Sequence, residues 1–454
     1  MKNVLLVILF ISSNLYAFCG FYVAKADAKL FNEASKVVMV RHDNKTVISM
    51  MNDYQGDLKD FAVVIPVPSV LKKDQIHIGD KATIEHLDSF TAPRLVEYFD
   101  RNPCQQVYTR TMEMSAGPMA QSGMADKKAS AKSLGVTVEA EYTVGEYDIV
   151  ILSAKESKGL ETWLLQNGYK IPDQAQAALK PYIKSGMKFF VAKVNIKEQN
   201  KTGLSYLNPL QVAFESNKFM LPIRLGTINA KGDQDIIIYI LSKEGRVESS
   251  NYQTVKFPSN IELPEYVQND FAKFYKDTFS AQVKKEGGQS IFTEYFWDMG
   301  WCDPCAADPL SKEELKSLGV FWLDDTENYP IQPNPGTMMP RRMPPQQSQP
   351  VKVTRLHARY NNKTFPQDIV FKETSDQQNF QSRFIIYRPW KGKASECSAA
   401  ASYLDQLEKR KEQWAQNLAN LTRWDINDIR KNVDIKPKED KSEKKKSWWQ
   451  KIWG

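Results

Sequence analysis

Histidine and cysteine are scarce in this chain, which has 454 residues but only four histidines and five cysteines. The histidines follow no spacing that is typical of a metal site. The sequence also lacks a nucleophile elbow, a phosphate-binding loop and the glycine pattern of dinucleotide-binding folds. We therefore predict no catalytic residue, no metal and no cofactor.

A strong net charge is missing as well. The chain has 61 Lys and Arg residues against 54 Asp and Glu residues, which gives a net charge of +7. Lys436–Gly454 alone holds seven lysines and three acids, and Lys2 adds one charge at the other end, so the rest carries only about +2. This balance argues against a nucleic-acid-binding surface. Hydrophobic residues make up 42% and charged residues 25%, as in globular rather than disordered proteins.

Long apolar runs are absent except for Val4–Ile11, which is too short to span a bilayer. Lys2 precedes this run and the small residue Ala17 follows it, which is the pattern of a secretory signal peptide. We predict cleavage after Ala17, and the bulky Phe18 argues against lipidation of Cys19. The protein is therefore expected to be exported to the periplasm or cell envelope, with no transmembrane helix in the mature chain.

The residue pattern predicts an α+β fold, with mixed, mainly antiparallel sheet blocks interleaved with helices and a long amphipathic helix near the C terminus. Strand and helix patterns alternate without the regular rhythm of a parallel α/β sheet. Expected strands are 36–41, 46–51 and 60–67, which we expect to form one meander, and 148–153, 188–194, 210–215, 219–225, 235–241, 351–360, 368–372 and 380–387. Expected helices are 80–100, 160–169, 174–183, 271–284, 311–318 and 396–421.

Composition divides the chain into five parts. We expect a signal peptide at 1–17, followed by an α+β body at 18–325 that contains a disordered insertion at 112–134. A proline-rich loop at 326–350 comes next. A β-meander plus long helix at 351–433 is expected to pack on the same body, and a basic, tryptophan-rich tail at 434–454 follows. The insertion has no periodicity, and the loop holds seven prolines between Pro330 and Pro350. Neither segment can supply a helix or a central strand.

The long helix carries an apolar stripe, which predicts that it packs on the body or on a partner helix. The stripe consists of Leu404, Leu407, Trp414, Leu418 and Leu421, with Lys411 at the missing position.

Two other segments resemble each other, because both are apolar strands interrupted by proline: Asp60–Pro68 (DFAVVIPVP) and Phe219–Leu225 (FMLPIRL). They give weak support for an internal repeat, and two ordinary edge strands are the preferred interpretation.

The cysteines, Cys19, Cys104, Cys302, Cys305 and Cys397, are disulfide candidates in an exported protein. The run Trp301–Cys305 (WCDPC) superficially resembles a thioredoxin active site, which requires a helix that begins at the motif. The predicted helix begins only at Ser311, so structural disulfides are preferred. We expect a local Cys302–Cys305 bridge, and either Cys104–Cys397 or Cys19–Cys104 as a long one.

Three basic side chains alternate along the strand expected at 351–360. Arg355, His357 and Arg359 would share one face and are candidates for binding an anion. A solvated outer face of a half-buried antiparallel strand is the preferred alternative.

Several strings, taken in their order along the chain, resemble one family. They are the Cys19-Gly20-Phe21 start, Asp60–Pro68, Leu160–Pro172, Phe219–Leu225, the Cys302-Asp303-Pro304-Cys305 motif, Val353–Tyr360 and the long helix that begins at Cys397. The chain resembles the exported bacterial domain-of-unknown-function family twenty-three-thirty over Cys19–Leu421. The resemblance implies export and a cysteine-bearing mixed fold, and it implies no activity, cofactor or catalytic residue.

The leading functional interpretation is a non-enzymatic envelope protein, either a binding or a structural module. The alternative is an exported thiol–disulfide oxidoreductase that uses Cys302 and Cys305. The sequence predicts no nucleic-acid partner, and it names neither a protein nor a glycan partner.

The tail is the one segment that suggests a membrane partner. Its last residues include the apolar side chains of Trp448, Trp449, Ile452 and Trp453, with lysines beside them. Tryptophan prefers the bilayer interface, and lysine is attracted to anionic headgroups. We predict a loose, peripheral contact with a membrane surface; docking of the tryptophans on the body, or simple fraying, is the alternative.

Removal of the tail tests this contact. The full chain is expected to co-sediment with anionic vesicles and to show blue-shifted tryptophan emission. High salt should weaken both effects, because it screens the lysine charges. A chain that ends at Ile435 is the control and should remain in the supernatant. If both chains sediment equally, the tail is not the membrane contact.

Overall fold

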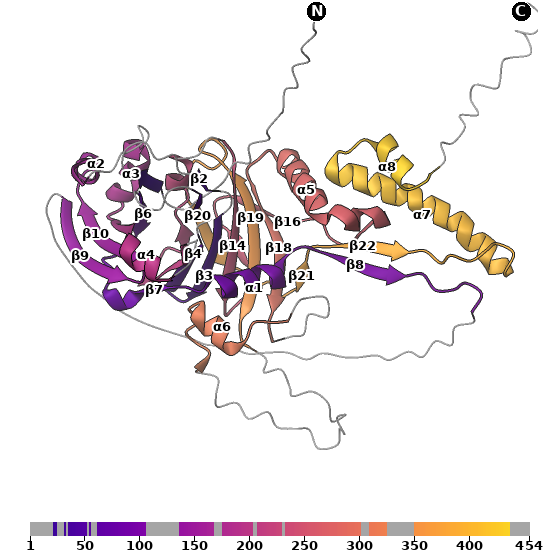
Figure 1. Cartoon of the computed structure of the whole chain (residues 1–454), viewed down its shortest axis with the longest axis horizontal. Coiled ribbons are helices and arrows are strands. Elements are labelled where there is room, and N and C mark those ends of the chain that lie inside the picture. The colour runs from indigo at the N-terminus through magenta and orange to yellow at the C-terminus, as the bar shows by residue number, and fades with distance from the viewer. Residues whose placement is uncertain are drawn as a thin grey trace, which may run out of the picture. The chain divides into compact units, whose positions relative to one another are not determined.

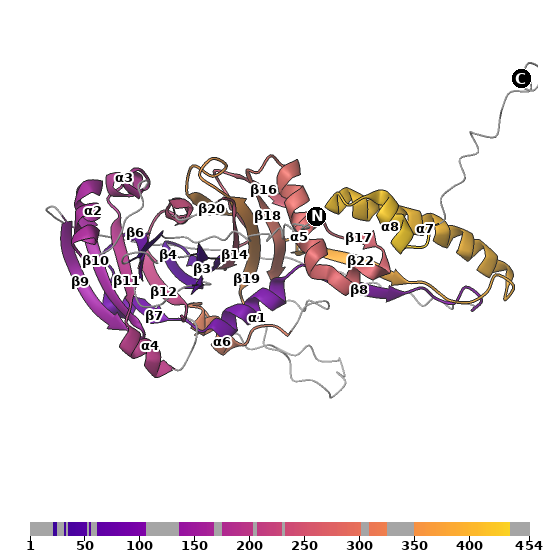
Figure 2. The same cartoon turned by 45° about the horizontal axis from the view of Figure 1, so that its top comes forward.

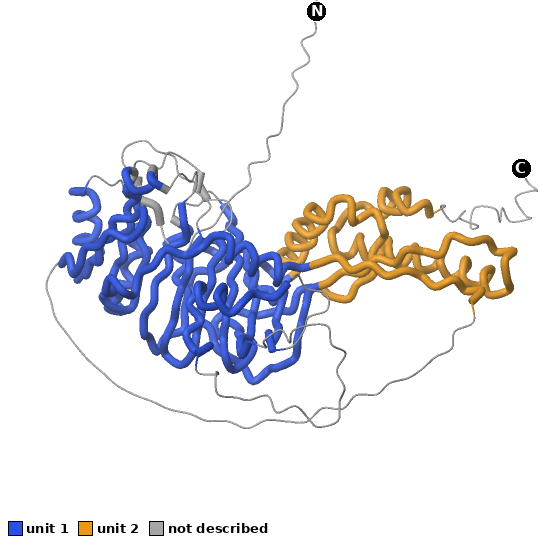
Figure 3. Tube along the Cα trace, turned by 60° about the horizontal axis from the view of Figure 1, so that its bottom comes forward, with its two compact units in different colours: residues 1–93, 125–257, 286–382 blue, residues 94–124, 258–285, 383–454 orange. Residues whose placement is uncertain are grey.

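The computed structural model describes residues 21–24, 31–32, 35–51, 54–55, 61–105, 136–167, 175–202, 207–228, 232–300, 308–324 and 349–435. The chain forms two compact units, which Figure 3 colours separately. Unit 1 draws on residues 1–93, 125–257 and 286–382, and unit 2 on residues 94–124, 258–285 and 383–454. Each unit is therefore assembled from segments that are distant in the sequence.

Unit 1 contains a nine-stranded mixed sheet in the order β16-β18-β19-β14-β3-β4-β12-β7, with β21 paired to β18. Neighbouring strands are antiparallel, except that β14 runs parallel to β3 and β16 runs parallel to β18. The strands are β3 (Ser35–His42), β4 (Lys45–Met51), β7 (Ile76–Ile78), β12 (Leu210–Glu215), β14 (Gln234–Ser242), β16 (Gln253–Lys256), β18 (Ser290–Asp298), β19 (Lys352–Tyr360) and β21 (Phe380–Gln381).

A second sheet of unit 1 is antiparallel and has five strands in the order β1-β6-β11-β10-β9. They are β1 (Phe21–Ala24), β6 (Phe61–Val67), β9 (Val136–Val144), β10 (Tyr147–Ala154) and β11 (Lys188–Val194). Shorter strands form a β13-β20-β15 sheet and a β2-β5 pair. They are β13 (Met220–Leu221), β15 (Val247–Ser249), β20 (Ile369–Glu373), β2 (Phe31–Asn32) and β5 (Tyr54–Gln55).

Helices cover the outer face of each large sheet (Figures 1 and 2). α2 (Ser157–Gln166) and α3 (Ala175–Lys184) share an apolar cluster with one face of the five-stranded sheet. α1 (Lys81–Thr91) and α6 (Lys312–Ser317) share another with one face of the nine-stranded sheet. The remaining helices of this unit are α4 (Ile196–Thr202) and the 3-10 helices Lys73–Gln75 and Arg224–Ile228. The inner faces of the two sheets share one large core, so unit 1 has four layers.

The helix starts in unit 1 follow from local sequence. Ser311 accepts a hydrogen bond from the Glu314 amide at 3.1 Å, and Glu314 accepts one from the Ser311 amide at 2.7 Å, so the two residues form a capping box. Asp80 caps α1 in a similar way, because its carboxylate accepts from the amides of Ala82 and Thr83. These side chains satisfy amides that have no partner inside the helix.

Unit 2 is built around a three-stranded, all-parallel sheet in the order β17-β22-β8. Its strands are β17 (Ile261–Leu263), β22 (Arg383–Arg388) and β8 (Arg94–Phe99), and its helices are the 3-10 helix Glu265–Asp270, α5 (Phe271–Lys285), α7 (Ser398–Thr422) and α8 (Ile426–Asn432). The ring of Phe274 on α5 lies 4.8 Å from that of Phe384 on β22. Trp414 on α7 donates to Glu262 on β17 at 2.7 Å. Side chains from both helices therefore contact the sheet.

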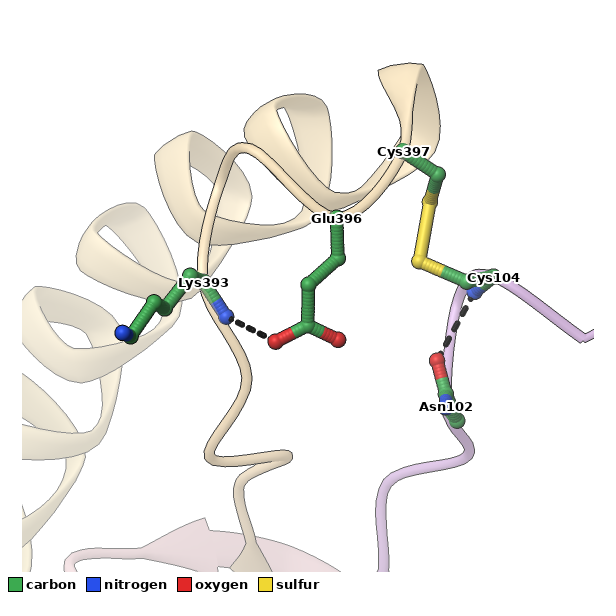
Figure 4. The surroundings of a disulfide bond; sticks show 5 residues. All are labelled: Asn102, Cys104, Lys393, Glu396 and Cys397. Carbon is green, nitrogen blue, oxygen red and sulfur yellow. Dashed lines mark hydrogen bonds between the residues drawn. A yellow bond between two sulfur atoms is a disulfide. The ribbon is translucent and has the colours of Figure 1, made fainter.

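A disulfide joins Cys104 to Cys397 within unit 2, with the two Cα atoms 5.8 Å apart (Figure 4). It connects the segment that follows β8 to the residue that caps the start of α7. The bridge is one of the two long pairings considered from the sequence. Its partners lie 293 residues apart, so it closes a very long loop in the unfolded chain.

The structure confirms the α+β class and the long helix, and it corrects several details. The expected meander is wrong, because β3 and β4 pair with each other while β6 pairs with β1 and β11 in the other sheet. The expected helix at 80–100 ends at Thr91, since Pro93 interrupts it, and Arg94–Phe99 continues as β8. The expected strand at 219–225 is reduced to β13 and a 3-10 turn.

The chain also divides differently from the expected ranges. The block at 351–433 is split after Ser382, because β19, β20 and β21 pair with strands of unit 1 whereas β22 pairs with β8 and β17 of unit 2. Strands β9, β15, β16, β17 and β18 were not expected from the sequence. Residues 1–17, the insertion at 112–134, most of the proline-rich loop and the tail beyond Ile435 lie outside the described residues. In the described part, no helix is long and apolar enough to cross a membrane.

Truncation of Leu418 tests the packing of α7. Leu418 is fully buried, so Leu418→Ala is expected to lower the free energy of unfolding of unit 2 by about 2–5 kcal/mol. Leu404 belongs to the same stripe but is only half-buried, and Leu404→Ala should cost clearly less. Urea unfolding followed by circular dichroism measures both. Equal, small losses would mean that the stripe does not pack in solution.

Candidate functional site

A cavity of about 540 Å³ lies in unit 1, lined by strands of both large sheets. The nine-stranded sheet contributes β4 and β12, the five-stranded sheet contributes β6, and the C-terminal part of α3 closes one side. Its apolar wall consists of Ile48, Met50, Ile65, Pro66, Val67, Pro68, Pro181, Met187, Val212, Phe214, Met220, Leu221, Pro222 and Val370. This volume and lining are typical of small-molecule sites.

The polar end of the cavity is organised by Asp368. Its Oδ1 accepts hydrogen bonds from the Tyr182 hydroxyl at 2.6 Å and from the amides of Ile223 and Arg224 at 3.0 and 3.2 Å. Asp368 is buried, and these donors offset the cost of removing its charge from water. Asp368, the residue before β20, is thus hydrogen-bonded both to α3 and to the turn after β13.

Two cations lie on the cavity wall. Nη2 of Arg224 is 3.4 Å from Oδ2 of Asp368, and the guanidinium lies 5.7 Å from the centre of the Tyr182 ring. The Nε of Arg224 is buried, and no described residue accepts a hydrogen bond from it. Among the described residues, no carboxylate forms an ion pair with the side chain of Lys218. The cavity therefore combines an apolar wall with two cationic side chains in its lining.

The two proline-interrupted strings in the sequence meet at this cavity. Pro66 and Pro68 come from the end of β6, and Pro222 follows β13. Proline has no amide hydrogen to donate, so none of these residues can contribute a backbone donor to strand pairing. The sequence thus contained a signal for two walls of the cavity. It contained none for Tyr182 and Asp368, which come together only through the fold.

The three anion-binding candidates lie on β19, and none of them is part of this cavity's lining. Nε of Arg355 lies 2.7 Å from Oε2 of Glu294, and Nδ1 of His357 lies 3.0 Å from Oε1 of the same carboxylate. Arg359 pairs with Asp235, with Nε 2.6 Å from Oδ1. Arg355 and His357 are 3% and 4% exposed, so their face is buried rather than solvated, contrary to the preferred interpretation. Anion binding by these residues stays a prediction.

A β-bulge explains how Glu294 reaches its partners. Thr293 pairs with Leu356 and Tyr295 with Arg355, so Glu294 is an extra residue in β18. A bulge breaks the strict alternation of side chains and re-aims one of them. Glu294 is thereby directed to the face of β19 that carries Arg355 and His357. A strand pattern read from sequence cannot locate such an extra residue.

Asp88 on α1 extends this buried cluster. It accepts from the Tyr239 hydroxyl and from Nη1 of Arg355, both at 2.6 Å, and Nζ of Lys36 lies 2.5 Å from its Oδ2. Burial raises the pKa of Asp88, but the charges of Arg355 and Lys36 outweigh burial and lower it to about 2. Burial also raises the pKa of Tyr239 well above its usual value of about 10. The cluster therefore holds paired charges that fix α1 to the sheet.

Cys19, Cys302 and Cys305 lie outside the described residues, as do Trp448, Trp449, Ile452 and Trp453. Within the residues that the structure describes, no group of three or more His, Cys, Asp or Glu side chains is arranged to hold a metal ion.

One family model matches the chain. It is described as "Uncharacterized protein conserved in bacteria (DUF2330)", and the match covers residues 13–372. No curated protein and no solved structure matches the chain.

Replacing Glu294 by glutamine tests the buried cluster. Glu294→Gln leaves Arg355 and His357 without their carboxylate, so the free energy of unfolding is expected to fall by about 3–5 kcal/mol. Asp235→Asn is the matched control, because it removes a carboxylate partner of Arg359 at a more exposed position, on β14 on the other side of β19, and should cost less than about 1 kcal/mol. Urea denaturation of both variants measures the difference. Similar small losses in both would contradict the assigned role of Glu294.

Proposed function

Since the chain belongs to the uncharacterised bacterial family DUF2330, which assigns it no activity, we propose that it is an exported binding protein whose site is the cavity of unit 1. The observation that carries this proposal is the combination of an apolar cavity of about 540 Å³ with two cationic side chains, Arg224 and Lys218, in its lining. Clefts of this size and composition are the usual places for small ligands.

The chemistry of the lining supports an amphiphilic acid as the ligand. The apolar wall would bury a hydrocarbon body, which is favourable by roughly 25 cal/mol per Å² of apolar surface removed from water. Arg224 and Lys218 would receive an acidic headgroup, because Asp368 already receives three hydrogen bonds and only partly neutralises Arg224. Hydrogen bonds to charged groups are roughly twice as strong as neutral ones. A carboxylate on an alkyl chain meets both requirements.

We also propose that the protein is exported. The basic start, the short apolar run and Ala17 support removal of a signal peptide and release to the periplasm or cell envelope. The Cys104–Cys397 disulfide supports an oxidising compartment. The lysines and tryptophans of the tail support a peripheral contact with a membrane surface, which would keep the cavity near a source of amphiphiles.

Displacement of a fluorescent fatty acid tests the cavity. The protein is expected to bind cis-parinaric acid, and dodecanoate should displace it about tenfold more effectively than dodecanol, since one charged hydrogen bond contributes roughly 1.5–3 kcal/mol. In Arg224→Gln, dodecanoate and dodecanol should displace the probe about equally well. Met220→Trp, which fills part of the cavity, should weaken the binding of both competitors.

Lys184→Gln is the matched control for the charge change. Lys184 is exposed on α3, next to the cavity residue Ser185, but it is not part of the lining. The variant should retain the preference for dodecanoate. If Arg224→Gln and Lys184→Gln behave alike, or if neither competitor displaces the probe, the cavity is not an acid-binding site.

A further inference from the structure

Unit 2 contains a pocket of its own, with a volume of about 340 Å³. It is lined by residues at the carboxyl ends of β17 and β22: Pro264, Glu265 and Tyr266 follow β17, and Tyr387 and Pro389 lie at the end of β22. Helices α7 and α8 complete the wall. Ligands of sheets with parallel strands commonly bind beyond these ends, where the chain leaves the sheet.

Aromatic rings form the apolar part of this pocket. Tyr266, Tyr387 and Trp414 line it, and the guanidinium of Arg410 lies 5.0 Å from the centre of the Tyr387 ring and 4.9 Å from that of Trp414. Asp100 accepts from Nη1 of Arg410 at 2.8 Å, which fixes the guanidinium in turn. The rings are therefore held in place before any ligand arrives, which reduces the entropy lost on binding.

Side-chain amides form the polar part. Gln268, Asn269 and Asn432 line the pocket, and the side chain of Asn432 hydrogen-bonds Tyr266. An amide offers a donor and an acceptor side by side, as a hydroxyl group does. A surface of amides and tyrosines thus suits a ligand with many hydroxyl groups.

The charges around this pocket are already paired. Glu265 forms an ion pair with Arg388, which also donates to Gln268 at 2.8 Å. Nζ of Lys411 lies 2.8 Å from a carboxylate oxygen of Glu408. A charged ligand would have to compete with these pairs, whereas a neutral ligand would not. In this respect the pocket differs from the cavity of unit 1.

We infer that this pocket binds a neutral saccharide, with the tyrosine rings against the apolar face of the sugar and the amides against its hydroxyl groups. Tyrosine suits this purpose, because it joins an apolar ring to a polar tip, and Tyr266 and Tyr387 are both partly exposed. The inference does not rest on the proposed cavity ligand: the two sites use different units and different chemistry.

Titration of the full chain with neutral trisaccharides tests the inference. Cellotriose, maltotriose and chitotriose are the probes, with isothermal titration calorimetry and saturation-transfer NMR as readouts. At least one of them is expected to bind, and trigalacturonate, which is acidic, should bind about tenfold more weakly or not at all, since tenfold corresponds to about 1.4 kcal/mol. Failure of all three to bind at millimolar concentrations overturns the inference.

Variants locate the binding to this pocket. Asn269 is exposed, so Asn269→Ala is expected to keep the fold and to weaken the bound trisaccharide about tenfold. Asn427→Ala, which changes an exposed asparagine of α8 outside the lining, is the matched control and should bind as the native chain does. Tyr266→Leu should weaken binding further. Unchanged affinity in both Asn269→Ala and Tyr266→Leu, or binding of a polyproline peptide in place of the sugars, would overturn the assignment.

Discussion

Burial of β6 on both of its faces is the constraint on which unit 1 depends. Ala62 and Val64 point to the cluster formed with α2 and α3, while Val63, Ile65 and Val67 point into the core between the two sheets. A strand that is apolar on both sides must be covered on both sides. The four-layer arrangement satisfies this requirement, with helices on one side and the nine-stranded sheet on the other. The cavity lies at the end of the same strand, where Pro66 and Pro68 have no amide hydrogen to donate.

Two buried carboxylates, Glu294 and Asp368, differ in how the cost of removing their charge from water is offset. Glu294 is surrounded by the cationic side chain of Arg355 and by His357, so its charge is paired deep in the sheet. Asp368 receives hydrogen bonds from a hydroxyl group and two backbone amides, and Nη2 of Arg224 lies farther away, 3.4 Å from its Oδ2. In the first arrangement the charges are paired within the fold, so the loss of one partner is costly to stability. The second leaves Arg224 on the wall of a cavity, with donor capacity for a ligand.

Much of the fold could be predicted from local patterns, and the exceptions have physical reasons. The strand at Lys188–Val194, the helix at Ser398–Thr422 and the Ser311 capping box follow from residue types at short spacing. Pairing partners do not, because β6 looks like a continuation of β3 and β4 until the second sheet is known. Leu95 and Phe99 match a helical spacing, yet Pro93 starts a strand there. For the cavity, the two proline-interrupted strings were visible, whereas Asp368 depends on contacts between residues up to 186 positions apart.

Methyl NMR tests most directly whether an amphiphilic acid binds in the cavity between the sheets, as we propose. Met50, Met187 and Met220 line the cavity, whereas Met299 lies in the cluster beneath α1 and α6. With 13C-methyl methionine in the full chain and stepwise addition of dodecanoate, the signals of these three methyl groups should shift together and saturate, while that of Met299 stays in place. Shifts spread evenly over methionines outside the lining, or none at Met50, Met187 and Met220, would contradict the account.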